Sequence, residues 1–411
     1  MFNNINNDFD IDLFKNKFVE IYGQSIYPIQ ICRGPARINI IGEHIDYNGG
    51  FVFPCAIDKY LYIGMRKRDD KKIIYNDLKF SGTFSFDVND EFMYKKENDY
   101  SNYLNGILSI IKREGFDFDF DFGFDVLIYS EIPSAGGISS SSALECCFAF
   151  SVSELFNFNI SQKDIALIGQ QSEHEFMNVK CGIMDQYIIS TAKENTCELL
   201  DCENVSHEYI PLNLGDYQFV VMNTKKKRQL ADSKYNERRE QCESVLSILN
   251  KQDFVLKNSK VSNTNELKNL CSISISDFDS VKFLIKDDVL CRRAFHCVSE
   301  NNRVLNSVDA LKNGDLFLLG KLMIESHKSL KENYEVTGIE LDTLVDCAIA
   351  QNSCLGARMT GAGFGGCAIA IVKKDLIDSF IKIVQEEYLK VIGYSAEFFS
   401  CNTSDGVSRL C

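Results

Sequence analysis

The chain has 411 residues, of which 45% are hydrophobic and 25% charged, proportions that are typical of a folded globular protein. The formal net charge of −14 disfavours nucleic acid or an anionic membrane as its main partner. Because a single hydrophobic core rarely serves more than about 250–300 residues, the length predicts two domains.

The cysteines and the N-terminal segment favour a reducing cytoplasmic location. The chain has 16 cysteines but no Cys-x-x-Cys pair and no spacing typical of a zinc site. Several of them, such as Cys146, Cys147 and Cys367, lie within apolar patterns, where cysteine behaves as a small hydrophobic residue. Residues 1–12 are rich in Asn and Asp and have no apolar h-region, so we expect no secretory signal. The apolar runs are all too short to span a membrane.

The first distinctive segment follows a polar lead-in and a short helix predicted within residues 1–30. From Ile31 to Tyr62 the sequence is β-rich and interrupted by glycines, and it holds four ionisable side chains within ten residues. These four are Arg37, Glu43, His44 and Asp46. An exposed turn with a chance charge cluster is one interpretation. Ile38, Ile40 and Ile41 instead indicate burial nearby, and buried charges need partners, which are often ligands.

A serine-rich turn forms the centre of the sequence. After a helix predicted at residues 100–112 and alternating Phe residues from Phe116 to Phe124, the apolar run 126–129 and the segment 131–145 predict strand, small-residue turn and helix. Gly136 and Gly137 allow a close backbone approach, and Ser139 to Ser142 lie where the helix begins. Free N–H groups and hydroxyls at a helix N-terminus favour a bound phosphate. A Ser-capped helix is the plainer alternative.

Residues 161–195 predict two helices that carry Glu173 and Asp185, an acidic pair suited to metal binding and proton transfer. They are also compatible with ordinary helix-surface carboxylates. Strands are predicted up to residue 223, followed by the basic tract Lys225–Arg228 and a helix carrying Tyr235. The mixed polar composition of residues 250–285 predicts a peripheral insertion.

A glycine-rich run, Arg358 to Gly366, follows helices predicted at 316–330 and 339–351. It matches the dinucleotide-binding spacing Gly-x-Gly-x-x-Gly, but the apolar residues after it predict a strand and not the helix that a Rossmann site requires. We therefore expect a tight loop that packs against the phosphate site or the neighbouring domain. A final helix at 375–389 and a strand near 397–399 complete an α+β pattern.

Several ordered segments now identify a resemblance. Residues 37–47 resemble the signature Gly-Arg-x-Asn-Leu-Ile-Gly-Glu-His-x-Asp-Tyr, 133–142 the loop Pro-x-Gly-x-Gly-Leu-Ser-Ser-Ser-Ala, and 358–366 the run Arg-Met-Thr-Gly-Ala-Gly-Phe-Gly-Gly. Residues 181–186 and 233–242 match as well. The chain thus resembles the kinases of galactose, homoserine, mevalonate and phosphomevalonate (the GHMP superfamily), and within them the galactokinase family. It differs at Ala36 for Gly, at Ala135 and Gly136 for a Gly-x pair, at Ser142 for Ala and at Tyr100 for Trp.

This resemblance implies an α+β, two-domain GHMP-kinase-like fold, with a ribosomal-protein-like β/α domain (residues 1–205), a ferredoxin-like α/β sandwich (206–411) and the active site in the cleft between them. It implies Mg²⁺–ATP as phosphoryl donor and galactose as acceptor at its anomeric hydroxyl. The implied catalytic residues are Asp185 and Arg37, and the implied metal ligands are Ser141 and Glu173. The implied sugar-binding residues are Arg37, Glu43, His44, Asp46, Gly182, Asp185 and Tyr235. The implied ATP-binding residues are Tyr100, Ala135, Gly136, Gly137, Ile138, Ser139, Ser140, Ser141 and Ser142.

Two alternatives remain open at the level of sequence. One is a kinase of the same superfamily for another sugar, such as N-acetylgalactosamine, arabinose or a uronic acid. The other is a catalytically silent galactose sensor on the same fold, although such relatives lose residues from the serine loop and this chain retains them. We expect a monomer that binds only small molecules.

Overall fold

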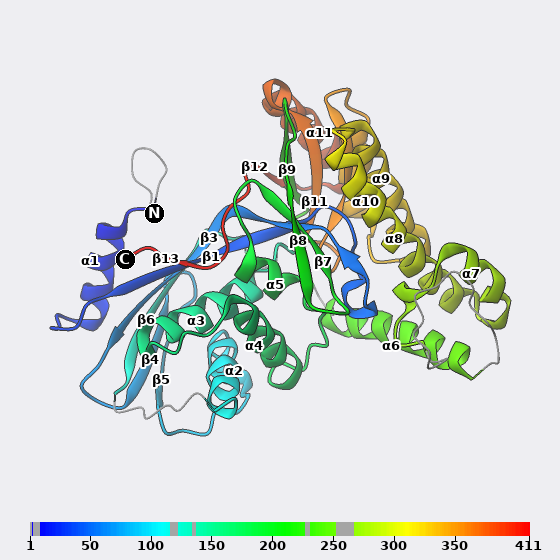
Figure 1. The fold of residues 1–411 in the computed structure, drawn as a ribbon. Coiled ribbons are helices and arrows are strands. Elements are labelled where there is room, and N and C mark those ends of the chain that lie inside the picture. Colours follow the sequence, from blue (N-terminus) through cyan, green and yellow to red (C-terminus); the bar gives the residue numbers. More distant parts are fainter. Residues whose placement is uncertain (1, 3–8, 116–121, 134–136, 227–230, 252–266) are drawn as a thin grey trace.

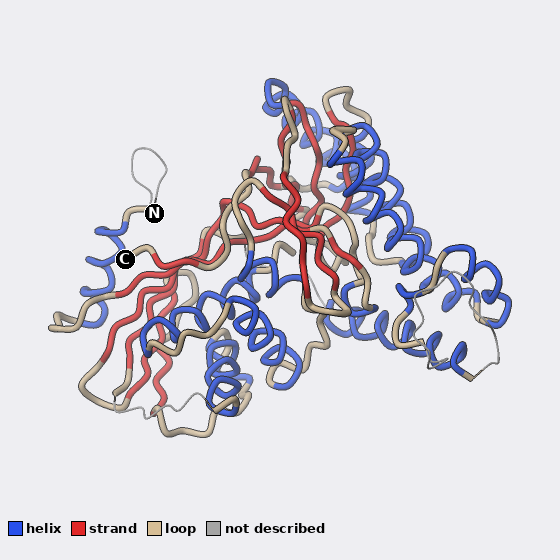
Figure 2. Tube along the Cα trace, viewed as in Figure 1, coloured by secondary structure: helices blue, strands red, loops and turns tan. Residues whose placement is uncertain are grey.

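The structure is a computed structural model that describes residues 2, 9–115, 122–133, 137–226, 231–251 and 267–411, without the side chains of 231–233. The architecture is α+β, as the sequence predicts, with two main sheets that carry helices on their faces (Figures 1 and 2). Among the described residues, no helix is both long and apolar enough to cross a membrane.

The larger sheet has six strands in the order β13-β1-β3-β6-β4-β5, antiparallel except for the parallel β4–β6 pair. Its strands are β1 (Gln30–Asn39), β3 (Pro54–Lys67), β4 (Lys72–Asp77), β5 (Thr83–Asp87), β6 (Phe124–Ser130) and β13 (Ser408–Arg409). Along β1 and most of β3 the side chains on both faces are buried, whereas β5 at the edge is partly exposed. Successive side chains of a strand point to opposite faces, so this central part of the sheet is covered by other elements on both sides.

Helix α1 covers one face and α2 to α5 lie on the other (Figure 1). The bounds are α1 (Ile11–Tyr22), α2 (Ser101–Arg113), α3 (Ser140–Phe156), α4 (Gln162–Glu175) and α5 (Met184–Thr191). On the α1 face, a Cβ added to Gly64 would lie 2.8 Å from the Phe14 ring, and on the other face one added to Gly34 would lie 2.8 Å from Cys147 of α3. Glycine in β1 and β3 thus lets these helices pack tightly on the sheet.

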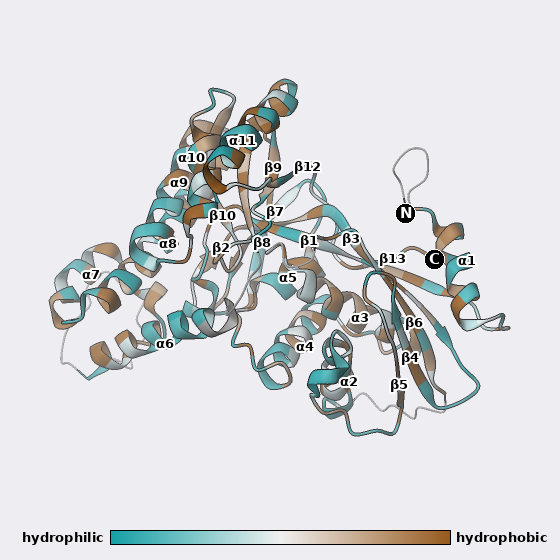
Figure 3. Cartoon of the chain, turned by 180° about the vertical axis from the view of Figure 1, so that it is seen from behind, coloured by the Kyte–Doolittle hydropathy of each residue, from teal (hydrophilic) through white to brown (hydrophobic). Residues whose placement is uncertain are grey.

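The second sheet is antiparallel, in the order β10-β11-β9-β12. Its strands are β9 (Tyr217–Asn223), β10 (Cys354–Thr360), β11 (Cys367–Lys373) and β12 (Glu397–Cys401). The accompanying helices are α6 (Ala231–Asn250), α7 (Ile275–Val281), α8 (Asp288–Lys312), α9 (Leu316–Ser329), α10 (Ile339–Ile349) and α11 (Ile377–Ile392). Figure 3 shows the hydrophobic residues along strands such as β6 and β9, and hydrophilic residues on the outer turns of α4.

A small third sheet joins β2 (Phe51–Val52), β7 (Thr196–Asp201) and β8 (Ser206–Pro211). The expected domain boundary between residues 205 and 206 falls in the turn of the β7–β8 hairpin. The last strand, β13, pairs with β1 in the larger sheet, so the end of the chain returns to the N-terminal half. The two-domain division at 205/206 stays a prediction.

Most elements lie where the sequence predicts them, and the expected peripheral insertion is the main difference. Residues 252–266 and the alternating run 116–121 lie outside the described residues, and β6 begins at Phe124. Within 267–285, however, Leu270 and Phe278 are buried, and Asn269 occupies the space beside Gly49. That part is therefore packed into the core, because residues 270–272 and α7 contact α8 and Cys271 lies beside Gly50, a pattern that its polar composition hides.

Candidate active site

A cavity of about 450 Å³ lies between residues of the N-terminal half and the glycine turn that joins β10 to β11. This volume is within the range of small-molecule sites. Thirteen of the sequence-predicted site residues line it: Arg37, Glu43, His44, Asp46, Gly137, Ser139, Ser140, Ser141, Ser142, Glu173, Gly182, Asp185 and Tyr235. The structure thus brings the three signature segments together around one space.

Arg37 lines the cavity just after a point where the pairing of β1 with β3 is irregular. The pairing of β1 with β3 shifts register between Pro35 and Ala36, and such bulges re-aim the side chain that follows. The Arg37 side chain is 3% exposed. Its Nε donates to Asp185 Oδ1 at 2.8 Å and its second guanidinium nitrogen to Oδ2 at 2.7 Å. A third nitrogen donates to the Gly137 carbonyl at 2.9 Å, so one side chain joins the acidic residue to the serine turn.

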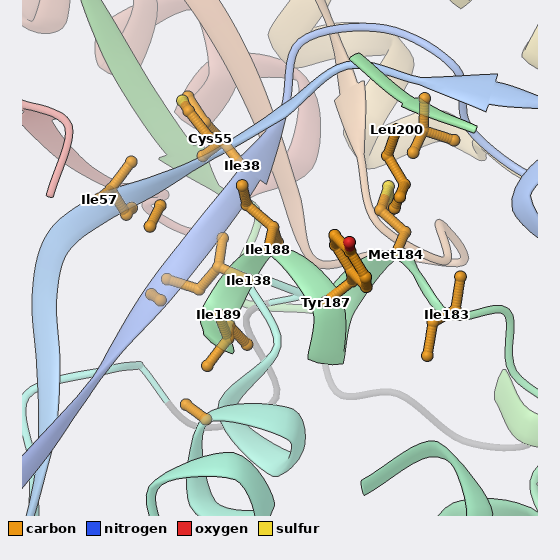
Figure 4. Packing of buried hydrophobic residues seen from close by; sticks show 14 of the residues in the cluster. Ile38, Cys55, Ile57, Ile138, Ile183, Met184, Tyr187, Ile188, Ile189 and Leu200 are labelled. Carbon is orange, nitrogen blue, oxygen red and sulfur yellow. The ribbon is translucent and has the colours of Figure 1, made fainter. Parts of the chain in front are cut away.

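Asp185 lies in the first turn of α5, where the positive end of the helix dipole favours a carboxylate. Ile188 and Ile189 of the same helix are fully buried, and Figure 4 shows them below Ile38 of β1 and beside Ile138. This packing fixes α5 while the Asp185 side chain, 29% exposed, stays open to the cavity. The two bonds from Arg37 hold this carboxylate in one orientation.

The serine turn is not a simple helix cap. Ser139 occupies the N-cap position of α3 with a left-handed φ of 63°, and its side chain makes no capping hydrogen bond within the described chain. Its hydroxyl instead donates to Asp185 Oδ2. Ser140, Ser141 and Ser142 in the first turn of α3 line the cavity. The hydroxyls and the helix N-terminus therefore face one space, which is the arrangement of an anion site.

The glycine turn packs directly on this serine turn, as expected from the sequence. A Cβ added to Gly361, whose φ is +82°, would overlap the Gly137 carbonyl oxygen. The Gly361 N–H donates to Glu43 at 2.8 Å, and this buried carboxyl also lies 3.5 Å from Arg358. Burial raises the pKa of Glu43 above its ordinary value, against the opposing effect of Arg358. Glu43 thus anchors the glycine turn as well as lining the cavity.

Asp46 packs directly against Gly182. A Cβ at Gly182 would overlap the Asp46 carboxylate, so only glycine leaves room for that side chain to enter the cavity. Burial, followed by the charges of Asp185 and Glu43, raises the pKa of Asp46 to about 7. Tyr235 of α6 lies beside them, with its ring centroid 5.2 Å from that of Tyr47 and 5.4 Å from that of His44.

His44 lines the cavity, yet both of its ring nitrogens have protein partners. Nδ1 lies 2.8 Å from the Tyr47 hydroxyl, and Nε2 lies 3.1 Å from the Ala362 carbonyl of the glycine turn. Burial, with a smaller effect of His296, lowers the pKa of His44 to about 3. The ring is therefore neutral at physiological pH and connects the first signature to the glycine turn.

The expected metal ligands, Ser141 and Glu173, both line the cavity. Hydroxyl and carboxylate oxygens are donors that suit Mg²⁺, which usually takes few protein ligands and keeps several waters. The described residues contain no cluster of three or more His, Cys, Asp or Glu side chains that could hold a metal ion. One turn below Ser141 on α3, Glu145 is fully buried, and neither of its carboxyl oxygens has a hydrogen-bond partner in the described part of the chain. Burial, then the charge of Glu173, raises the pKa of Glu145 well above its ordinary value.

Two predicted nucleotide-binding residues do not line the cavity, and two others, Ala135 and Gly136, are outside the described residues. Ile138 is buried in the core, and Tyr100 packs its ring edge-on against Phe84 at 5.2 Å. Seven residues that line the cavity were not among the predicted site residues: Tyr103, Val179, Cys181, Met184, Gln186, Gly361 and Ala362. Cys181, Met184 and Gln186 adjoin Gly182 or Asp185 in sequence, and Gly361 and Ala362 lie in the predicted glycine loop, so adjacency was the available signal for these. Tyr103 lies one helical turn after Tyr100, and Val179 lies three residues before Gly182.

Comparison with known proteins agrees with this geometry. The model of the galactokinase galactose-binding signature matches residues 16–67, and those of the GHMP kinase N-terminal and C-terminal domains match 102–193 and 307–390. A galactokinase of Clostridium beijerinckii is 42% identical over 403 residues, which cover 98% of this chain and 99% of that protein. The chain belongs to the galactokinase family. A galactokinase of Enterococcus faecalis is 43% identical over 97% of this chain and 99% of its own length.

Solved structures support the assignment to the galactokinase family. The crystal structure of Lactococcus lactis galactokinase complexed with galactose has a TM-score of 0.91 and 39% identity, covering 97% of this chain and all of that one. Mevalonate kinase from Methanococcus jannaschii has a TM-score of 0.63 at 20% identity over 91% of this chain and 98% of its own, a likeness that shows the shared fold.

Proposed function

We propose that this chain transfers the γ-phosphoryl group of ATP to the anomeric hydroxyl of galactose, giving galactose 1-phosphate. The observation that carries the proposal is the Arg37–Asp185 pair, which faces a cavity bounded by the serine turn on one side and the first signature on the other. The full-length similarity to galactokinases of two bacterial genera supports the choice of reaction and sugar.

On the acceptor side, Asp185 has the position and charge to take a proton from a sugar hydroxyl or to stabilise its approach to the phosphorus. Phosphoryl transfer depends mainly on positioning and charge neutralisation, and a well-placed base contributes about 10²- to 10⁴-fold in rate. Arg37 donates to both carboxylate oxygens, so Asp185 keeps one orientation. The Ser139 hydroxyl restrains it further.

The sugar is proposed to bind among Glu43, His44, Asp46, Gly182 and Tyr235. A polyol presents several hydroxyls in fixed directions, and each buried hydroxyl needs a geometric partner. Carboxylates such as Asp46 accept, while the Tyr235 hydroxyl both donates and accepts. Tight packing between Asp46 and Gly182 fixes the position of the carboxylate, so the site discriminates between sugars by the placement of their hydroxyls.

On the donor side, the backbone at Gly137 and residues Ser139 to Ser142 are proposed to hold the phosphates of ATP at the N-terminus of α3. Glu173 and Asp185 line the same cavity, so we expect a cation to offset the repulsion between these carboxylates and the phosphates. Ser141 and Glu173 fit Mg²⁺ by their donor atoms and their place in the lining. When bound, Mg²⁺ supplies charge neutralisation for the transferring group.

The nucleotide is tested by thermal unfolding of the unmodified protein. A ligand that binds only the folded state raises Tm, and at 100 times its Kd it adds about 2.7 kcal/mol to the free energy of unfolding. We expect Mg²⁺–ATP to raise Tm and NAD to leave it unchanged. Protection by NAD without protection by ATP would mean that the serine and glycine turns are both misassigned.

A further inference from the structure

A chain of hydrogen bonds runs from the cavity into the C-terminal half. The Tyr47 hydroxyl lies 2.8 Å from His44 Nδ1 and 2.9 Å from the Tyr334 hydroxyl. The Tyr334 hydroxyl lies 3.2 Å from Cys242 Sγ of α6, which is 3.8 Å from Cys297 Sγ of α8. Tyr334, Cys242 and Cys297 are all buried, so these groups satisfy one another away from bulk water.

The chemistry of the end groups fixes the direction of every bond. The Ala362 carbonyl only accepts, so His44 Nε2 carries the proton and the neutral ring offers Nδ1 as an acceptor. Tyr47 must then donate its one hydroxyl proton to Nδ1, and Tyr334 must donate to Tyr47. The Tyr334 oxygen is left to accept from the Cys242 thiol. All donors point toward His44, and such aligned bonds polarise one another.

The backbone around Tyr334 is built to hold this hydroxyl in place. Tyr334 ends a π-helical segment, Leu330–Tyr334, and π-helical turns occur frequently at functional sites. The Arg238 Nε donates to the Tyr334 carbonyl at 2.8 Å. Arg238 belongs to α6, the helix that also carries Tyr235 of the cavity and Cys242 of the chain of bonds. Arg238 and Cys242, which bond to Tyr334, therefore lie on the same helix as Tyr235 of the cavity.

We propose that Tyr47 and Tyr334 are positioning residues. They set the orientation of the His44 ring, so that its Nε2–H donates to the Ala362 carbonyl and fixes this part of the glycine turn beside the sugar. His44 then acts on the glycine turn through Ala362, as Glu43 does through Gly361, and contacts the sugar with its ring and not with a free nitrogen. The part concerning sugar affinity rests on the proposed galactokinase function. The part concerning the orientation and protonation of the His44 ring holds independently of that function.

The first test reads the ring directly, with protein labelled with ¹⁵N in its five histidines and the His44 signals assigned with a His44→Asn variant. In the unmodified protein we expect a protonated Nε2 and an unprotonated, hydrogen-bonded Nδ1. Tyr47→Phe should move the Nδ1 resonance toward that of an unbonded imidazole nitrogen, and Tyr334→Phe should move it less in the same direction. An Nδ1 resonance that both variants leave unchanged would overturn the proposal, whatever the protein catalyses.

The second test measures kinetics. Loss of one buried hydrogen bond costs about a factor of 5 to 10, so Tyr47→Phe should raise the galactose KM by roughly that factor while the ATP KM and kcat change less than about twofold. Tyr22→Phe is the matched control, because its partly buried hydroxyl on α1 also donates to one group, Val126 O, and accepts from another, Asn76. Equal changes in both variants, or a rise in the ATP KM alone, would contradict a role at the sugar.

Discussion

Replacing Asp185 by Asn is expected to lower kcat by at least about 100-fold while the protein stays folded. Asn has nearly the same shape but neither the charge nor the basicity of Asp, so it removes the group that takes the hydroxyl proton. Arg37 retains its bond to the Gly137 carbonyl, which limits the structural change. Galactose binding, measured by calorimetry without turnover, should change by no more than about tenfold, because the substitution removes an interaction that acts mainly in the transition state.

Asp164→Asn provides the control for this experiment. Asp164 also lies in the first turn of a helix, α4, where it accepts a hydrogen bond from the Ser161 hydroxyl, and it does not line the cavity. Its replacement should leave kcat unchanged. Near-normal turnover by Asp185→Asn would remove this residue from the mechanism. An unmodified protein that binds galactose and ATP without turnover would instead be a sensor.

Replacing Gly361 by Ala is expected to reduce kcat/KM by about 100-fold or more, because displacements of about 1 Å at an active site have effects of this size. The added Cβ would overlap the Gly137 carbonyl oxygen, so the glycine and serine turns would have to separate. Backbone faces backbone here, and no side chain can rotate away. The shift would also weaken the Gly361 N–H bond to Glu43 and the Arg37 bond to Gly137.

Gly393→Ala is the control that separates the effect of steric crowding from the effect of backbone strain. Gly393 has a φ of +86°, close to the +82° of Gly361, but a Cβ there would meet nothing within 4 Å. It should cost about 1 kcal/mol of stability, as left-handed alanine does, and leave kinetics unchanged. If Gly361→Ala behaved like Gly393→Ala in both stability and activity, the two turns would not need to stay in contact for the reaction.

Local patterns predicted the elements that hold the site. The apolar run before the serines and the spacing after them predicted strand, turn and helix, and β6 and α3 lie there. The apolar residues after Gly366 predicted a strand, and β11 confirms it. These predictions worked because each depends on residues within one turn or one strand, where periodicity reports burial directly.

Long-range partners could not be predicted in this way. His44 was expected to bind sugar, and only the fold shows that its Nε2 faces a carbonyl 318 residues away. Nothing in the sequence near Tyr334 indicates that it bonds to Tyr47, because the contact needs α9 to continue into a π-helical turn. Likewise, the re-aiming of Arg37 depends on a bulge whose partner strand is β3. The Arg37–Asp185 pair itself came from the family resemblance and was confirmed by the structure.

The most direct measurement is ATP-dependent phosphorylation of a panel of sugars, with the product identified by ³¹P NMR. Galactose should be the best acceptor and should give only the 1-phosphate. Glucose, which differs at the C4 hydroxyl, should react much more slowly, by up to about 10⁴-fold, because moving one hydroxyl leaves polar groups of the site unpaired. Equal rates with glucose, or a clear preference for N-acetylgalactosamine or arabinose, would contradict the assignment of galactose as substrate.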